Sequence, residues 1–313
     1  MEGRLQGLAR RVEAVALVAA GALALLFHLT LPSKLPGEPD FEAAAAAVAQ
    51  EKQPGDVVLL HPWWTERARL FMPDGVPVVG FLGSDRAELE TAPRIWVLSQ
   101  PDLPRAGASS FWDAFRPGRA PLGEERRFGT LRLSLHRNGR FRPTLFSAAE
   151  SIARARAYVE SSPGVKKADC APDPGGFSCP GGAARVQVVW REVHFEPRRC
   201  VSMYPPGGDD RLVVEFPDGA PAGDRLSLEA GVVWEWAAYT DPRLRPVRAG
   251  VEGARGEALA QVSIAPAQER WQRDARPRAE AGPLKLWLSA VVPDNRETCV
   301  DLRIQGPAAG GGS

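Results

Sequence analysis

Polar and aromatic side chains follow three short apolar runs in the first half of the chain. Because ligands of open α/β sheets bind outside the carboxyl ends of the strands, these side chains are the first candidates for a site. They are His61, Trp63 and Trp64 after the run 56–60, Ser84 and Asp85 after 76–82, and Ser99, Gln100 and Asp102 after 94–98.

His61 and Asp85 have the chemistry of an acid and base pair, and Trp63 and Trp64 have flat faces that can stack on a sugar ring. A structural interpretation accounts for the same residues: Asp85 caps a helix, His61 bonds to loop backbone and the tryptophans fill a core. The sequence favours this second interpretation, because no third group at a recognisable spacing orients His61. We therefore assign no catalytic residue and keep His61 and Asp85 as weak candidates.

Trp234 and Trp236 form a second aromatic pair. They lie two residues apart in a predicted strand, so both side chains share one face of it. If exposed, they make a platform for a sugar or a partner protein; if buried, they are core. The pattern favours core, and the pair stays a candidate for ligand binding together with Trp63 and Trp64.

Composition and missing motifs exclude several classes of function. The chain has 39 basic and 38 acidic residues, so its charge does not attract nucleic acid. No G-x-S-x-G, glycine-rich phosphate loop or H-E-x-x-H sequence occurs. The four histidines are scattered and the four cysteines lack a zinc spacing. We expect no metal and no cofactor.

An almost continuous apolar run from Ala14 to Leu31 is long enough to cross a bilayer as a helix. Arg4, Arg10 and Arg11 precede it, which predicts a cytoplasmic amino terminus and export of the rest. A cleaved signal peptide is the alternative, although no A-x-A site follows the run. We expect an uncleaved single-pass anchor (12–31) in the inner membrane, with a cytoplasmic tail (1–11), a stalk (32–39) and a periplasmic remainder.

The elements beyond the stalk change character along the chain. Strands alternating with short helices predict a small α/β domain over 40–138. A capping box at 147–150 predicts a helix that runs to about Glu160 within a connector (139–164). Short strands separated by Pro-Gly and Pro-Asp turns then predict a jelly-roll-like β-sandwich over 165–306, followed by a flexible tail (307–313). The predicted strands are 185–195, 201–204, 211–216, 225–236, 247–251, 258–264, 284–292 and 299–304.

Two segments resemble known families. The motifs Pro54-Gly-Asp-Val-Val-Leu-Leu, Arg94-Ile-Trp-Val-Leu and Phe128-Gly-Thr-Leu-Arg-Leu make residues 40–138 similar to the soluble periplasmic domain of polyprenyl-phosphate-sugar-dependent membrane glycosyltransferases. This chain has one apolar helix instead of their catalytic membrane bundle, so the resemblance implies a setting and no transferase activity. Arg199-Cys-Val-Ser-Met-Tyr-Pro-Pro, Asp224-Arg-Leu-Ser-Leu-Glu and Pro293-Asp-Asn make residues 165–306 resemble a galactose-binding-like jelly roll. That family binds glycans in some members and is structural in others.

All four cysteines lie in the second half of the chain, and an even number in an exported segment predicts disulfides. Cys170 and Cys179 flank a turn-rich loop that closes easily. Cys200 begins the predicted sandwich and Cys299 opens its last strand, and such strands commonly run side by side in jelly rolls. Of the three connectivities, we predict Cys170–Cys179 with Cys200–Cys299.

Together these features predict a membrane-anchored, non-catalytic binding or assembly protein of the bacterial cell envelope, whose ligand is a glycan or an envelope protein. One alternative is an enzyme of envelope glycan metabolism that uses His61 and Asp85. The other is a structural subunit of a large envelope machine, which fits the missing motifs equally well.

Overall fold

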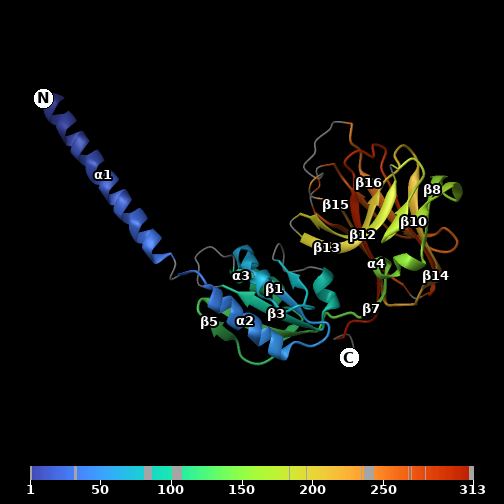
Figure 1. Cartoon of the computed structure of the whole chain (residues 1–313), viewed down its shortest axis with the longest axis horizontal. Helices are drawn as coiled ribbons and strands as arrows, with labels where there is room; N and C mark the ends of the chain where they lie inside the picture. Colours follow the sequence, from blue (N-terminus) through green and yellow to red (C-terminus); the bar gives the residue numbers. More distant parts are fainter. Residues whose placement is uncertain are drawn as a thin grey trace. The chain divides into compact units, whose positions relative to one another are not determined.

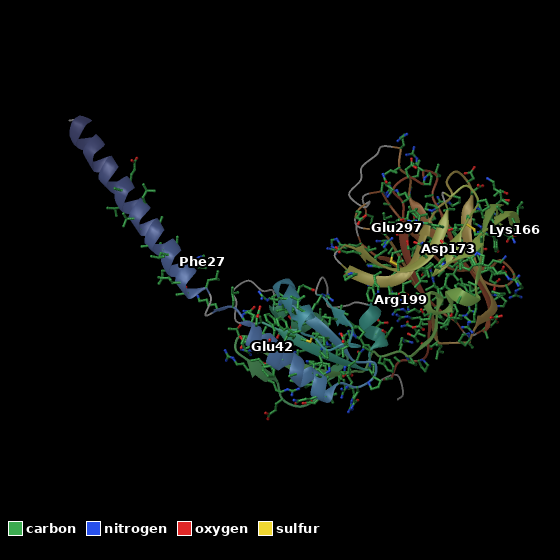
Figure 2. All side chains as sticks on the ribbon, viewed as in Figure 1. Phe27, Glu42, Lys166, Asp173, Arg199 and Glu297 are labelled. Atoms are coloured by element: carbon green, nitrogen blue, oxygen red, sulfur yellow. A yellow bond between two sulfur atoms is a disulfide. The ribbon has the colours of Figure 1, made fainter. Side chains whose placement is uncertain are left out.

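The computed structural model describes residues 2–31, 34–80, 87–100, 108–182, 184–194, 196–233, 235, 243–266, 268, 270–278 and 280–309. The chain divides into two compact units at Asn138 and Gly139 (Figure 1). Helix α1 (Glu2–Thr30) contains one window, Glu13–Thr30, that is long and apolar enough to cross a membrane. Within it no residue is buried, and Phe27 is 62% exposed (Figure 2). A signal sequence near an amino terminus has the same length and composition.

The first unit is built on one mixed sheet with helices on both faces. Its strands are β1 (Val57–His61), β2 (Val78–Val79), β3 (Arg94–Ser99), β4 (Arg119–Pro121), β5 (Arg126–Phe128) and β6 (Leu131–Asn138). The order is β2-β1-β3-β6-β4, with β5 also paired to β6, and β1 runs parallel to β2 and β3. The helical segments are α2 (Glu38–Glu51), η2 (Trp63–Leu70), η3 (Ala87–Thr91) and α3 (Ala108–Phe115).

Apolar alternation along these strands explains the two cores. Val58 and Leu60 pack with Phe41 of α2 on one face, while Val57 and Leu59 belong to the core of the other face. Strand β6 lies inside the sheet, because β3 pairs with one of its sides and β4 and β5 pair with the other. Helix α3 contributes Phe111 and Phe115 to the second core.

The second unit is a sandwich of two antiparallel sheets around one apolar core. The eight-stranded sheet has the order β10-β11-β12-β13-β20-β15-β18, with β7 also paired to β20. Its strands are β7 (Thr144–Ser147), β10 (Ala171–Asp173), β11 (Gly176–Ser178), β12 (Arg185–Val193), β13 (Glu196–Tyr204), β15 (Arg225–Val232), β18 (Gln272–Pro277) and β20 (Thr298–Gln305). The six-stranded sheet has the order β17-β16-β19-β14-β8-β9. Its strands are β8 (Arg156–Ser162), β9 (Val165–Asp169), β14 (Arg211–Ala220), β16 (Val247–Glu252), β17 (Ala258–Ile264) and β19 (Gly282–Ser289).

The fold class is therefore the predicted one: an apolar amino-terminal helix, an α/β layer unit and a jelly-roll-like sandwich. The predicted connector helix is wrong beyond its first turns. Helix α4 (Ala148–Ser151) and the 3-10 turn η4 (Ile152–Arg154) end before β8, which pairs with β14. Ala157 and Val159 enter the core from β8, and Tyr158 and Glu160 alternate with them. Pairing with a strand 51 residues away overrides the local preference of an alanine-rich segment.

Candidate functional site

His61 lies at the carboxyl end of β1, beside Ser99 at the end of β3. The side chains of His61 and Ser99 are 3% exposed, and that of Gln100 is fully buried. The imidazole of His61 stacks on the Phe111 ring, with centroids 3.9 Å apart, and burial lowers its pKa to about 4. It is therefore neutral at pH 7 and closed off from solvent. The Gln100 amide donates to the carbonyl of Lys34 and to Thr130 Oγ1, so this strand end is occupied by internal contacts.

The other predicted candidates cannot be placed from the described residues. Ser84, Asp85, Asp102, Trp234 and Trp236 lie outside them. Trp63 and Trp64 begin η2, but their side chains also fall outside the description. Among the residues described, no group of three His, Cys, Asp or Glu side chains is arranged to hold a metal ion.

Disulfides join Cys170 to Cys179 and Cys200 to Cys299, the pairs predicted above. The Cys200–Cys299 bond links neighbouring strands β13 and β20, with Cα atoms 5.6 Å apart. Both sulfurs belong to a small apolar cluster with Val193 and Val233. This cluster is separate from the main core, because Val201 and Val300, the next residues along each strand, face the inside of the sandwich.

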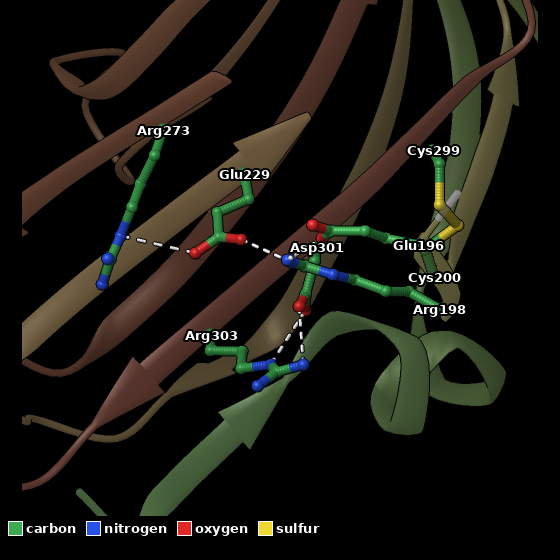
Figure 3. A network of polar contacts seen from close by, with 8 residues as sticks. All are labelled: Glu196, Arg198, Cys200, Glu229, Arg273, Cys299, Asp301 and Arg303. Carbon is green, nitrogen blue, oxygen red and sulfur yellow. Dashed lines mark hydrogen bonds and ion pairs between the residues drawn. A yellow bond between two sulfur atoms is a disulfide. The ribbon is translucent and has the colours of Figure 1, made fainter. Parts of the chain in front are cut away.

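A largely buried network of charged side chains lies close to this disulfide, on β13, β20 and the neighbouring strands β15 and β18 (Figure 3). Arg198 binds Glu229 at 2.6 Å and Glu196 at 3.1 Å, and all three side chains are at most 13% exposed. Arg273 adds a contact of 3.3 Å to Glu229, and Arg303 pairs with Asp301 at 2.6 Å. Burial raises the pKa of Glu229, which the nearby Arg198 opposes. Three arginines face three carboxylates here, so the charges compensate one another and tie β13, β15, β18 and β20 together.

Glu297, just before β20, is the centre of a second polar cluster (Figure 2). Its carboxylate accepts hydrogen bonds from Arg191 Nε at 2.5 Å, from Ser202 Oγ at 2.6 Å and from the Tyr204 hydroxyl. Burial raises the pKa of Glu297, but the three hydrogen bonds outweigh it and hold that pKa below its usual value. As in the charge network, the polar groups of this cluster bind one another, so we interpret the cluster as structural.

The sandwich also contains a cavity of about 550 Å³ at one end. It lies between the start of β15, the turn from β16 to β17, and the turn from β18 to β19. Its apolar lining comes from Leu226, Leu259, Pro277 and Pro283. The charged side chains of Arg255, Glu257, Arg278 and Glu280 also line it. The volume lies in the range of small-molecule sites, and the lining combines apolar side chains with four charged ones.

The β16–β17 turn fixes Glu257 at the cavity. Gly256 has φ +79°, which suits glycine, and the N–H of Gly253 donates to the Glu257 carbonyl at 3.0 Å. The Glu257 carboxylate accepts the backbone N–H of Arg255 at 2.9 Å. A Cβ on residue 253 would stand 2.0 Å from this carboxylate, so a larger residue there would displace the carboxylate from its present position. The turn therefore holds one acid in a defined position.

Arg278 contributes the most buried charge of the cavity. It directly follows β18, where its backbone N–H and carbonyl bond to Asp224 and Gly223. Burial lowers the pKa of its guanidinium, and attraction by Glu257 and Glu280 offsets this only in part. None of the candidate site residues predicted from the sequence lines this cavity. A signal was present in the two turns, Gly253-Ala-Arg-Gly-Glu257 and Arg278-Ala-Glu-Ala-Gly282, where opposite charges stand beside glycines.

No protein-family model matches the chain, and no curated protein matches it. Solved structures with partial similarity to it include the following three. A structure of CBM51-2 and INT domains from Clostridium perfringens ZmpB, in complex with GlcNAc, is 11% identical over 38% of this chain and 26% of its own, with a TM-score of 0.27. CBM51 from Clostridium perfringens GH95, in complex with methyl-galactose, is 12% identical over 41% of this chain and 81% of its own, with a TM-score of 0.26. A family 35 carbohydrate binding module from Clostridium thermocellum is 13% identical over 40% and 89%, with a TM-score of 0.25.

The chain thus spans about a quarter of the first of these structures. The similarity of residues 40–138 to a glycosyltransferase periplasmic domain stays a prediction.

Proposed function

We propose that the sandwich is a non-catalytic saccharide-binding module and that the cavity beside Arg278 is its binding site. The observation that carries this proposal is the lining of the cavity. Leu226, Leu259 and the two prolines offer apolar surface for the C–H faces of a sugar ring. The carboxylates accept hydrogen bonds from hydroxyl groups, and the guanidinium groups donate to hydroxyl oxygens. A cavity of about 550 Å³ has room for a short saccharide.

We also propose that α1 anchors the module in a bacterial inner membrane with both folded units in the periplasm. The window Glu13–Thr30 supports the anchor by its length and composition. Two disulfides support an oxidising compartment, because disulfides form and persist in exported proteins and are rare in the cytosol. A reporter enzyme that folds only in the periplasm should be active when it is fused after Gly306. Activity of a reporter that works only in the cytoplasm would contradict the proposed orientation of the anchor.

Binding is tested on the full chain in a detergent without a sugar head group. We expect at least one saccharide in a panel of glucose, galactose, N-acetylglucosamine and uronic acid trisaccharides to raise the melting temperature and to titrate calorimetrically. At a hundredfold excess over Kd, binding adds about 2.7 kcal/mol to the free energy of unfolding. Calorimetry gives Kd directly, so the melting shift and the affinity can be checked against each other.

Two exposed alanines provide a matched pair of variants. Ala281→Trp places a bulky ring at the cavity and should abolish binding, because residue 281 lines it. Ala171→Trp makes the same change on β10, away from the cavity, and should leave binding intact. Equal binding by both variants would move the site elsewhere. Release of reducing ends from a bound saccharide would show catalysis and contradict a purely binding role.

A further inference from the structure

The end of helix α1 is joined closely to one edge of the sheet in the first unit. The N–H of Lys34 donates to the carbonyl of Leu31, the residue that follows the helix, at 3.0 Å. The carbonyl of Lys34 accepts a hydrogen bond from the Gln100 amide at 2.9 Å, and Gln100 directly follows β3. Even a fully extended chain spans only about 11 Å over the three residues from Leu31 to Lys34. The carboxyl end of β3 therefore lies close to the end of the apolar helix.

Helix α2 and strand β3 define two ends of this unit, because they run in opposite directions. The helix begins at Glu38, shortly after Lys34, which binds Gln100 at the end of β3. At the other end of the helix, the Glu51 carbonyl accepts a hydrogen bond at 2.8 Å from Arg94, the first residue of β3. A helix of 14 residues is about 21 Å long. The near end, beside Gln100, is thus separated from the far end, beside Arg94, by most of that length.

Part of η2 is exposed along the near end. Arg67 forms an ion pair with Glu38, the first residue of α2. Phe71, which follows η2, stacks on Phe41 in the first turn of α2, with centroids 5.6 Å apart. Leu70 lies between these two contacts in the sequence and is 80% exposed. Residues three apart eclipse one another in a 3-10 helix, so Leu70 and Arg67 share one face of η2.

The stalk adds two exposed side chains of the same two kinds. Lys34 is exposed, and Leu35 is 42% exposed. We call these four residues the near-end surface: Lys34, Leu35, Arg67 and Leu70. Exposed leucines beside lysine and arginine are typical of segments that lie in the interface between lipid headgroups and acyl chains. The headgroup layer is about 5–8 Å thick on each side of a bilayer, so residues this close to the end of a spanning helix can reach it.

We propose that the near-end surface docks on the lipid headgroups of the membrane that α1 crosses. Leu35 and Leu70 contact the boundary with the acyl chains, and Lys34 and Arg67 bind lipid phosphates. A bilayer is the partner because the short connection to α1 holds this end of the unit beside it. The inference rests on the proposed anchor and goes beyond it, since it fixes which end of the first unit faces the membrane.

The test uses the full chain, with one copy in each nanodisc of phosphatidylcholine and phosphatidylglycerol. An added cysteine carries an NBD fluorophore, and lipid with a spin label on its headgroup is the quencher. A label on Leu70→Cys should be quenched at least about twofold more than one on Gln53→Cys. Gln53 is exposed and follows α2 at the far end. The emission of the label at position 70 should also shift to the blue, because lipid contact removes water from it.

Two charge reversals provide a matched pair of variants. Arg67→Glu should reduce the quenching of the label at position 70, because it replaces a phosphate ligand by an acid. Arg137→Glu makes the same change at the far end, where Arg137 is exposed and pairs with Arg94, and should leave the quenching unchanged. Equal effects of the two reversals would remove Arg67 from the surface. Melting temperatures verify that all variants fold.

Equal quenching at positions 70 and 53 would overturn the docking. Quenching at position 70 that requires two copies in one nanodisc would identify a second chain as the partner and also overturn it. A label on Ala20→Cys, within the window Glu13–Thr30, tests the anchor separately with lipid spin-labelled in its acyl chains. Quenching at position 20 without quenching at position 70 would remove the docking and leave the anchor standing. No quenching at position 20 would remove both.

Discussion

Arg211 on β14 binds the carboxylate of Glu252 on β16 across the intervening strand β19. The two terminal nitrogens of Arg211 lie 2.6 and 3.2 Å from the two oxygens of Glu252, and its Nε donates to Glu160 on β8 at 2.6 Å. The guanidinium carbon also lies 5.6 Å from the ring centroid of Trp287 on β19. One side chain thereby joins four strands of the six-stranded sheet.

Arg211→Met should destabilise the sandwich by about 3–5 kcal/mol, because it leaves the largely buried carboxylates of Glu160 and Glu252 without their cationic partner. The side chains of Glu160 and Glu252 are only 2% and 13% exposed. Arg276→Met removes an exposed ion pair and should stay within about 0.5 kcal/mol of the parent protein. Denaturant unfolding of the full chain measures both. Equal losses in the two variants would show that the Arg211 contacts contribute little.

Glu297 should make the sandwich sensitive to acid. Its pKa in the folded state lies below the ordinary value of 4.5, so the stability that it contributes is present above about pH 4.5. That stability is lost as the pH falls through the lower folded-state pKa. Tyr204→Phe removes one hydrogen bond to the carboxylate and should cost about 1.5–3 kcal/mol at pH 7. Glu297→Gln should flatten the dependence of melting temperature on pH below 4.5; an unchanged acid limb would refute the assignment.

His61 should affect the stability of the first unit and leave saccharide binding unchanged. Burial lowers its pKa from 6.5 to about 4, so the unfolded chain takes up a proton between these values and the folded chain does not. Stability is therefore full above pH 6.5 and falls by up to about 3 kcal/mol as the pH drops to 4. His61→Phe should reduce this slope, and the remainder should come from His136, whose pKa burial also lowers to about 4. Loss of binding in a folded His61→Phe protein would instead support the acid and base hypothesis.

The two disulfides should differ in their effect on stability. Cys200–Cys299 closes a separation of 99 residues and Cys170–Cys179 one of 9. In the chain-entropy model these correspond to about 4.7 and about 2.6 kcal/mol. Replacing both cysteines of a pair by alanine should therefore lower the melting temperature more for the long bridge. Non-reducing peptide mapping checks the pairing itself, and a Cys170–Cys200 peptide would contradict it.

Local patterns in the sequence were sufficient for most elements of the sandwich. The alternation from Arg225 to Val232 places Leu226 and Leu228 in the core and Ser227 and Glu229 on the opposite face. Turn residues between the runs separated neighbouring strands. These signals work because hydrophobic burial at period two acts on each strand by itself, whatever strand it pairs with.

What only the tertiary structure decided depends on residues far apart in the chain. The local sequence around Glu160 predicts a helix, but this segment pairs with β14 as a strand of the sheet. Arg211 on β14 then donates a hydrogen bond to the Glu160 carboxylate. The cavity likewise forms only when the turns at Gly253 and Gly282 meet over Leu226. No local sequence pattern predicts that these two turns lie together. The free energy of contacts between them depends on the packing of the two sheets, which takes the polar groups of the turns out of water.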